Sequence, residues 1–144
     1  MFDSILVVCV GNICRSPTGE RLLSGALPQK RVSSAGISAM TGCHAEKIAS
    51  EIAAQHGISL EGHVARQLTS TMCRDADLIL VMEKNQVEQV AQINPAVRGK
   101  TMLFGHWLNQ REISDPYRKS RDAFEATYGL LEDAARKWVN VLRR

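Results

Sequence analysis

Two hydrophobic patterns alternate along the chain: short continuous apolar runs, and longer segments whose apolar positions recur every three or four residues. Ile5–Val8, within an expected strand Ser4–Cys9, and Leu78–Met82 are continuous apolar runs, which is typical of strands buried on both faces of a sheet. Arg31–Ser34 is short and alternating, and Lys100–Phe104 is predicted to be the fourth strand. The sequence therefore predicts four short strands distributed over most of its length.

Helical periodicity and helix-terminal residues predict the elements between and after these strands. Gly57 is a favourable residue just beyond a helix end. Proline cannot continue a helix, so Pro28 and Pro95 are each expected to end the helix that precedes them. The predicted helical segments are Pro17–Ala26, Ala45–His56, the short turn Thr69–Arg74, Glu83–Ile93 and Ser120–Leu142. A single apolar stripe marks the last of these helices and predicts core packing: Phe124, Tyr128, Leu131, Ala135, Trp138 and Leu142.

Strands that alternate with helices at short spacing predict βαβ units with right-handed crossovers. The expected fold class is therefore α/β: a three-layer sandwich with a parallel sheet and helices on both faces. Ile58–Gln67 and Gly105–Ser114 show no clear period and are expected to be loops. At 144 residues, with no linker or repeat, residues 1–144 are expected to form a single domain.

Composition excludes several classes of function. A net charge of +3 is too small to indicate nucleic-acid binding, and the few aromatic residues are not interleaved with arginine. The longest apolar runs are far shorter than the roughly 20 residues that span a bilayer. Asp3 and the strand that follows it at once do not resemble a signal peptide, so a cytoplasmic protein without membrane insertion is expected.

Four cysteines are present, but their spacing indicates neither a disulfide framework nor a metal site. There is no C-x-x-C pair, and the four histidines do not pair with cysteine at zinc spacing. We therefore expect no metal and no cofactor. Cys43 and Cys73 are expected to pack without a chemical role.

The segment from Cys9 to Pro17 concentrates the candidate chemistry. It joins the first buried strand to a predicted helix start, with Ser16 as the expected N-cap and Pro17 at the first helical position. A strand, a tight loop and a helix N-terminus together form an anion site, because backbone N–H groups and the helix dipole favour negative charge. Cys9 and Arg15 stand at the two ends of this loop.

In an open parallel sheet, ligands bind beyond the carboxyl ends of the strands. This rule separates the chemistry-bearing residues into two groups. Asp75 and Asp77 precede a strand, which places them at the opposite edge with a structural role. The residues expected at the active edge follow strands: Cys9, Arg15, Ser34, Glu83 and Asp115.

Cys9 is the candidate nucleophile, since loop amides, a helix N-terminus, Arg15 and the Ser16 hydroxyl would all favour a thiolate. Arg15 can donate two parallel hydrogen bonds to a phosphoryl group. The G-x-x-x-x-G-K-[ST] pattern of nucleotide-binding loops is absent, which argues against ATP, GTP and a required magnesium ion. Phosphoryl transfer without a metal is the chemistry that these residues favour.

A phosphate ester also needs a proton for its leaving oxygen, and a phenol has a pKa of about 10. Asp115 is the best candidate for this general acid, because it lies at the expected active edge and Pro116 stiffens its backbone. Glu83 is the alternative acid, although a residue that opens a helix is better explained by the helix dipole.

These segments resemble the low-molecular-weight protein tyrosine phosphatase family over essentially the whole chain. The most specific match is Val8–Pro17, with the sequence VCVGNICRSP, followed by Asp115–Tyr117 near the C-terminus. Further segments of the chain also resemble the family: Ser34–Gly36, His63–Arg66 and Asp77–Met82. The resemblance implies a four-stranded parallel sheet of the phosphotyrosine phosphatase I-like fold.

The resemblance also implies a mechanism and residue roles. Cys9 would attack the phosphorus of phosphotyrosine, Arg15 would hold the phosphoryl oxygens, and Asp115 would protonate the tyrosine oxygen. A cysteinyl-phosphate would form, and Asp115 would then act as base for the hydrolytic water. The implied phosphate-binding loop is Val10, Gly11, Asn12, Ile13, Cys14 and Ser16, with Asn12, Ser16, Ser34 and His63 as a supporting network. Ile13, Met40 and Tyr117 would line the substrate slot, and Cys14 would trap oxidised Cys9 as a reversible disulfide.

One departure points to a subgroup. Arg118 follows Tyr117 where members of the eukaryotic type often have a second aromatic residue, and Ser38–Met40 offers no aromatic wall. The slot is therefore expected to be open. The chain is similar to bacterial members that dephosphorylate membrane tyrosine autokinases controlling capsule or exopolysaccharide production, and a monomer that acts on such a phosphotyrosine protein is expected.

Two other functions fit parts of the pattern. An arsenate reductase of the same fold also uses Cys-x5-Arg, but it needs two further cysteines in relay downstream. Cys43 and Cys73 are 30 residues apart, and no cysteine follows Cys73. A non-catalytic phosphotyrosine- or anion-binding module is the second alternative, against which the combination of Cys9, Arg15 and Asp115 argues.

Overall fold

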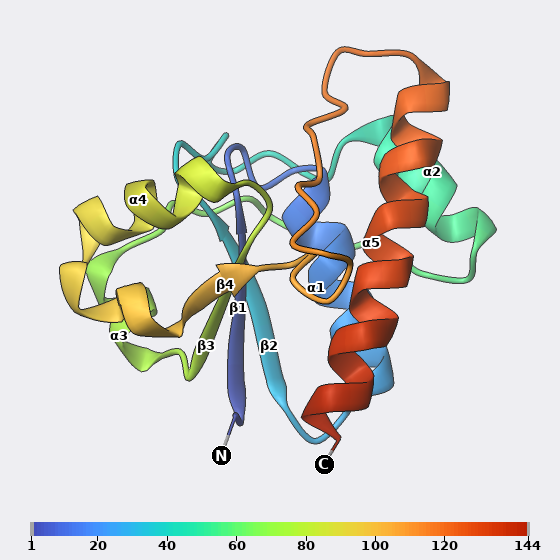
Figure 1. Cartoon of the computed structure of the whole chain (residues 1–144). Helices are drawn as coiled ribbons and strands as arrows, with labels where there is room; N and C mark the ends of the chain where they lie inside the picture. Colours follow the sequence, from blue (N-terminus) through green and yellow to red (C-terminus); the bar gives the residue numbers. More distant parts are fainter. Residues whose placement is uncertain (1, 144) are drawn as a thin grey trace.

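A four-stranded sheet lies at the centre of the computed structural model, which describes residues 2–143 (Figure 1). All pairings are parallel, and the strand order is β2-β1-β3-β4. The strands are β1 Ser4–Cys9, β2 Arg31–Gly36, β3 Leu78–Val81 and β4 Thr101–Leu103. The four predicted strands and the parallel sheet are therefore confirmed.

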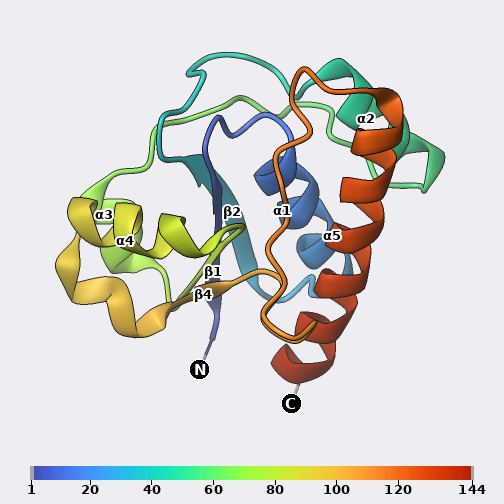
Figure 2. The same cartoon turned by 45° about the horizontal axis from the view of Figure 1, so that its top comes forward.

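Helices cover both faces of this sheet, as the α/β three-layer prediction requires. Figures 1 and 2 show α1 and α5 on one face and α3 and α4 on the other, with α2 packed beyond the sheet beside α5. The helical elements are α1 Arg15–Ala26, α2 Lys47–Gln55, α3 Ser70–Asp75, α4 Lys84–Ile93, the 3-10 helix η1 Pro95–Lys100 and α5 Arg121–Leu142.

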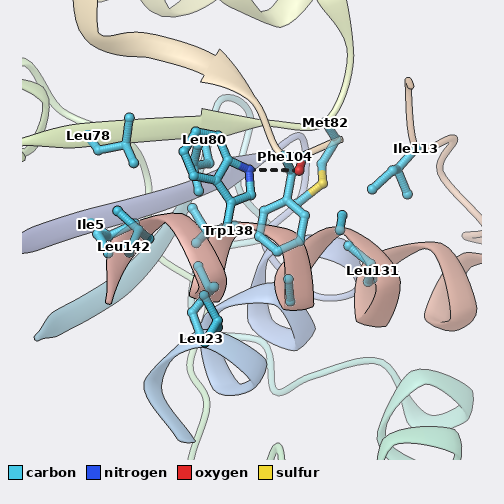
Figure 3. Close-up of a cluster of buried hydrophobic side chains, with 14 of the residues drawn as sticks. Ile5, Leu23, Leu78, Leu80, Met82, Phe104, Ile113, Leu131, Trp138 and Leu142 are labelled. Atoms are coloured by element: carbon cyan, nitrogen blue, oxygen red, sulfur yellow. Dashed lines mark hydrogen bonds between the residues drawn. The ribbon is translucent and has the colours of Figure 1, made fainter. Parts of the chain in front are cut away.

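Alternation along the strands supplies both faces of the core. Ile5 and Val7 of β1 face α1 and α5, whereas Leu6 and Val8 face α3 and α4. Figure 3 shows the first of these layers, in which the Trp138 indole N–H donates to the Phe104 carbonyl at 2.9 Å. The labelled side chains of this layer are Ile5, Leu23, Leu78, Leu80, Met82, Phe104, Ile113, Leu131, Trp138 and Leu142.

A third cluster lies beyond the sheet and bears on the functional loop. Ile13 and Cys14 pack there against Ile52 of α2 and against Phe124 and Tyr128 of α5. The segment that follows β1 is thereby fixed by helices from two distant parts of the chain.

Most of the predicted helices are confirmed, with small differences at their ends. Thr69 is the N-cap of α3, and Gly57 follows α2 with a positive φ of 80°. The prediction that Ser16 caps the first helix is wrong, because α1 begins two residues earlier, at Arg15, with Cys14 at the N-cap position. Pro17 stands within the first turn, where a missing N–H is tolerated. The pattern did not predict η1.

Asp77 lies at the opposite edge of the sheet, as predicted. Its carboxylate accepts the backbone N–H groups of Asp3 and Ser4 at 2.9 and 3.0 Å. These hydrogen bonds hold the pKa of Asp77 below its ordinary value. Between residues 2 and 143, no helix has the length and apolar content needed to cross a membrane.

Candidate active site

The loop between β1 and α1 turns its carbonyl groups away from the space that it encloses. Each carbonyl from Cys9 to Ile13 accepts a hydrogen bond from the surrounding chain; the donors are the N–H groups of Ile37, Ser38, Met40 and Glu46, and the His63 ring. In a trans peptide the following N–H points opposite to the carbonyl, and there is no cis bond among residues 2–143. The N–H groups of residues 10–14 therefore point inward and form an anion cradle.

Asn12 holds this loop in shape. Its φ of +59° is left-handed, a conformation that asparagine tolerates better than most residues. Its side-chain amide donates to Ser16 Oγ at 2.7 Å and to Ser34 Oγ at 3.1 Å, and its Oδ1 accepts the Arg66 N–H at 3.0 Å. Every polar atom of this buried side chain is satisfied, which fixes a strained turn in one conformation.

Ser16 connects Asn12 to the candidate nucleophile. Its Oγ lies 3.0 Å from Cys9 Sγ and accepts the Asn12 amide on its other side. When Cys9 is a thiolate it can only accept, so the serine O–H is then the donor. The hydrogen bond stabilises negative charge on sulfur, while Cys9 itself is 2% exposed at the carboxyl end of β1.

Two further residues of the predicted network, Ser34 and His63, bond to the loop on the side away from the slot. Ser34, near the end of β2, donates its hydroxyl to Glu20 of α1 at 2.7 Å. The His63 Nε2 atom lies 2.6 Å from the Asn12 carbonyl, which makes the ring nitrogen the donor. The structure thus brings Ser34 and His63 into the network where the resemblance placed them.

Arg15 is buried with part of its donor capacity unused. Its Nη1 donates to Glu83 Oε2 at 2.7 Å and to the Ile113 carbonyl at 2.8 Å. Its Nε is buried without a hydrogen-bond partner among the described residues. The Nε and Nη2 atoms present two parallel N–H donors along one edge of the guanidinium, the geometry that matches two phosphoryl oxygens.

Glu83 orients Arg15 and is itself fixed by its own helix. It is the N-cap of α4 in a capping box, in which Gln86 Oε1 accepts the Glu83 N–H at 3.1 Å. Gln86 Nε2 also approaches Glu83 Oε2 at 3.3 Å. The sequence placed Glu83 at the correct edge and assigned it to the helix dipole, but its contact with Arg15 was not predicted.

Asp115 approaches the loop from the opposite end of the sequence. Its Oδ2 lies 3.7 Å from Arg15 Nη2, and its side chain is 43% exposed. Its Oδ1 accepts the Tyr117 N–H at 3.0 Å, which makes a tight turn around Pro116. The carboxylate thereby faces the cradle while it remains accessible to water.

A slot of about 190 Å³ opens above the cradle. Cys9 lies in its lining, and Asp115 and Tyr117 line it from the loop that precedes α5. The remaining lining residues are Val10, Gly11, Ile13, Cys14, Ser38 and Met40. All three residues expected to form the wall, namely Ile13, Met40 and Tyr117, are therefore at the slot, together with Ser38, which was not predicted.

Cys14 lines the slot together with Cys9, but its thiol is in a different environment. Burial, reinforced by the nearby carboxylate of Asp115, raises the pKa of Cys14 far above its ordinary value. Cys14 is therefore a neutral thiol at physiological pH. No disulfide links it to Cys9 in this structure, where both are free.

The other two cysteines lie outside the slot. Cys73 is fully buried in the core on the α3 and α4 side of the sheet, as predicted, whereas Cys43 is exposed, so the prediction that it packs is wrong. Within residues 2–143, no three or more His, Cys, Asp or Glu side chains are grouped so that they could hold a metal ion.

Comparison with known proteins gives consistent matches. The family model for low molecular weight phosphotyrosine protein phosphatase matches residues 4–144. The chain is 67% identical over 144 residues to the probable low molecular weight protein-tyrosine-phosphatase AmsI of Erwinia amylovora, covering 100% of both. It is 58% identical over 143 residues to the phosphatase Etp of Escherichia coli K12, covering 99% of this chain and 97% of Etp.

Solved structures agree with these relatives. The crystal structure of AmsI superimposes with a TM-score of 0.98, covering 100% of this chain and 95% of that one. The tyrosine phosphatase Wzb from Escherichia coli K30, in complex with sulphate, is 52% identical with a TM-score of 0.96, covering 99% of each chain. The chain belongs to the low molecular weight phosphotyrosine protein phosphatase family.

Proposed function

We propose that the protein hydrolyses phosphotyrosine through a cysteinyl-phosphate, with Cys9 as nucleophile, Arg15 as phosphoryl clamp and Asp115 as general acid. The observation that carries this proposal is the buried Nε–H of Arg15, which has no hydrogen-bond partner among the described residues and stands at the end of the cradle loop. Glu83 pairs with the other side of the guanidinium, but a buried N–H donor without an acceptor is unfavourable, so this position favours binding of an anion that can accept from it. A phosphoryl group supplies three oxygens for these donors.

In the first step, the Cys9 thiolate attacks phosphorus and the bond from phosphorus to the tyrosine oxygen breaks. The proton of Asp115 passes to that oxygen, so neutral tyrosine leaves and Asp115 becomes a carboxylate. The cradle amides and Arg15 neutralise charge on the equatorial oxygens throughout. In the second step, Asp115 accepts a proton from water, which attacks phosphorus and releases phosphate and the Cys9 thiolate.

Residues behind the loop have positioning roles in this proposal. Ser16 stabilises the thiolate, and the Asn12 amide holds Ser16 in place. Ser34 and His63 in turn fix the side chain and the carbonyl of Asn12. Glu83 orients the guanidinium of Arg15 so that its Nε and Nη2 edge faces the slot. These interactions exist before substrate binds, which reduces the reorganisation needed in the reaction.

Cys14 is proposed to guard the nucleophile against oxidation. If Cys9 is oxidised to a sulfenic acid, the Cys14 thiol condenses with it to form a disulfide and water, which prevents irreversible oxidation. Because burial raises the pKa of Cys14, this condensation should accelerate as pH rises.

The physiological substrate is proposed to be a membrane tyrosine autokinase that controls capsule or exopolysaccharide production, on which the protein acts as a cytoplasmic monomer. The slot supports a substrate of this kind, since its exposed rim residues Val10 and Met40 leave room for a phosphotyrosine on a flexible segment. Incubation with a purified, autophosphorylated kinase should remove its phosphotyrosine, as measured by immunoblot. Retention of the phosphotyrosine would contradict this substrate.

The central test is hydrolysis of p-nitrophenyl phosphate and of a phosphotyrosyl peptide, with and without EDTA. Activity should survive EDTA, and Cys9→Ser should lower kcat by at least about 10³-fold because the covalent route is lost. Cys43→Ser is the matched control, since Cys43 is exposed and does not line the slot. Mass spectrometry of acid-quenched reactions should locate phosphate on Cys9. Phosphate on another residue would overturn the mechanism.

A further inference from the structure

A second concave surface begins at Asp115 and leads away from the slot. This groove of about 600 Å³ lies between residues 109–119 and the exposed face of α5, and the start of α4 closes one end. Asp115 lines both the groove and the slot, so the two are continuous at this residue. A peptide whose phosphotyrosine occupies the slot can therefore extend into the groove.

The charged residues of the groove are mainly cations. Lys84, Arg111 and Lys119 line it, all three are exposed, and none makes a salt bridge with a described carboxylate. Arg118, which is also exposed, lies beside them with its guanidinium carbon 5.4 Å from the centre of the Tyr117 ring.

The two acidic residues of the groove already have partners. Asp115 is within 3.7 Å of Arg15, and Glu112 accepts the Lys84 N–H at the start of α4 at 2.8 Å. Elsewhere on the surface, arginines pair with neighbouring carboxylates, as Arg98 does with Glu88 and Arg121 with Glu51. The groove therefore holds three cations, none of them in a salt bridge within the described part of the chain, against two carboxylates that each accept from a neighbouring group.

We propose that this groove, hereafter the basic groove, binds acidic residues next to the phosphotyrosine and so selects peptides with Asp or Glu there. The proposal rests on the proposed function, because the phosphotyrosine must occupy the slot for its neighbours to reach the groove. Complementary charge favours such peptides by direct pairing and by faster encounter. The groove extends from the slot in one direction. Acidic residues should therefore raise kcat/KM only when they stand on one side of the phosphotyrosine, either before or after it.

The test compares kcat/KM for three phosphotyrosyl peptides: one with two Glu residues before the phosphotyrosine, one with two after it, and one with Gln at all four positions. One acidic peptide should be preferred over the Gln peptide by about three- to tenfold at low salt. The preference should fall at high ionic strength, because exposed charges are screened.

Variants assign the preference to the groove. Arg111→Gln combined with Lys119→Gln should reduce the ratio of acidic to Gln peptide toward one. Lys137→Gln, an exposed position of α5 outside the groove, is the matched control and should retain the ratio. Hydrolysis of p-nitrophenyl phosphate, which carries no flanking residues, normalises each variant for the integrity of the slot.

Equal kcat/KM for all three peptides in the parent protein would overturn the proposal that the basic groove selects acidic peptides. A preference for an acidic peptide that is unchanged in the double variant would also overturn it. Loss of activity toward every peptide and toward p-nitrophenyl phosphate in the parent would instead overturn the proposed function. The two failures are therefore distinguishable in one set of measurements.

Discussion

The two halves of the candidate site are built in opposite ways. The loop from Cys9 to Ser16 is buried except at Val10 and Gly11, and its carbonyls and side chains are held by partners from several elements. The segment around Asp115 has a half-exposed carboxylate that accepts one backbone N–H and approaches Arg15 at 3.7 Å. One half is rigid before substrate arrives, whereas the other is free to adjust.

This difference matches the two tasks that the chemistry sets. An anion cradle works best when its dipoles are already oriented, because reorganisation during the reaction raises the barrier. The general acid recovers its proton in the second step from the attacking water, so water must be able to reach it. The loop should therefore tolerate substitution poorly in both activity and stability, and Asp115 should be sensitive in activity alone.

The largest effect is expected from Arg15→Lys. A lysine ammonium cannot bond Glu83 and Ile113 while it also presents two parallel donors to a phosphoryl group. We expect kcat/KM to fall by about 10²- to 10³-fold, and inorganic phosphate to inhibit more weakly in proportion. Unchanged inhibition by phosphate would mean that Arg15 does not bind the anion.

The next largest effect is expected from Asp115→Asn, and its size should depend on the leaving group. On phosphotyrosine, kcat should fall by about 10²-fold or more with little change in KM. On p-nitrophenyl phosphate the loss should be smaller, since nitrophenolate leaves more readily without a proton. The free energy of unfolding, from urea denaturation, should change by less than about 0.5 kcal/mol. Equal losses on both substrates would contradict the acid role.

Asn12→Ala, unlike Asp115→Asn, should lower the free energy of unfolding as well as the activity. It removes the amide that joins Ser16, Ser34 and Arg66, and it places alanine at a φ of +59°. We expect unfolding to become easier by about 1–3 kcal/mol and kcat/KM to fall about tenfold. Asn12→Gly, which relieves the backbone strain but removes the same amide, separates the two contributions. A stability unchanged in both variants would mean that the network does not fix the loop.

The smallest effect on activity is expected at the opposite edge of the sheet, from Asp77→Asn. The carboxylate of Asp77 has a lowered pKa in the folded protein, so its stabilisation is present above about pH 4 and is lost as pH falls below that value. The variant should be less stable than the parent at pH 7, and the difference should shrink in acid. The kcat should not change. A difference in stability that is constant from pH 7 to pH 3 would contradict this account.

The sequence predicted the architecture well because its signals were local. Continuous apolar runs identified β1 and β3, a single stripe identified α5, and the rule for parallel sheets placed Cys9, Glu83 and Asp115 at one edge. The start of α1 was misplaced because Ser16 has the residue type of an N-cap, whereas its hydroxyl serves Cys9 and Asn12 instead. Tertiary hydrogen bonds overrode a local preference there.

The contacts that shape the site could not be predicted from patterns. Glu83 pairs with Arg15, and the Ile113 carbonyl accepts from the same nitrogen, although this carbonyl belongs to a loop with no sequence signal. Likewise, the Arg66 N–H and Glu20 enter the loop network only through the folded arrangement of β2 and α1. A capping box at Glu83–Gln86 was the one local feature that could have indicated an oriented carboxylate.

The hydrogen bond from Arg15 to the Ile113 carbonyl joins residues 98 positions apart, and this separation affects the order in which the site forms during folding. During synthesis, residues 9–66, which supply the hydrogen bonds to the loop carbonyls, emerge long before Ile113 and α5, which complete the packing of Ile13, Cys14 and Arg15. Contacts of such long range are formed late in folding, because loop closure is unfavourable until the rest is ordered. Because the Ile113 carbonyl holds Arg15, recovered turnover and phosphate affinity in a refolding experiment should both report this last docking step.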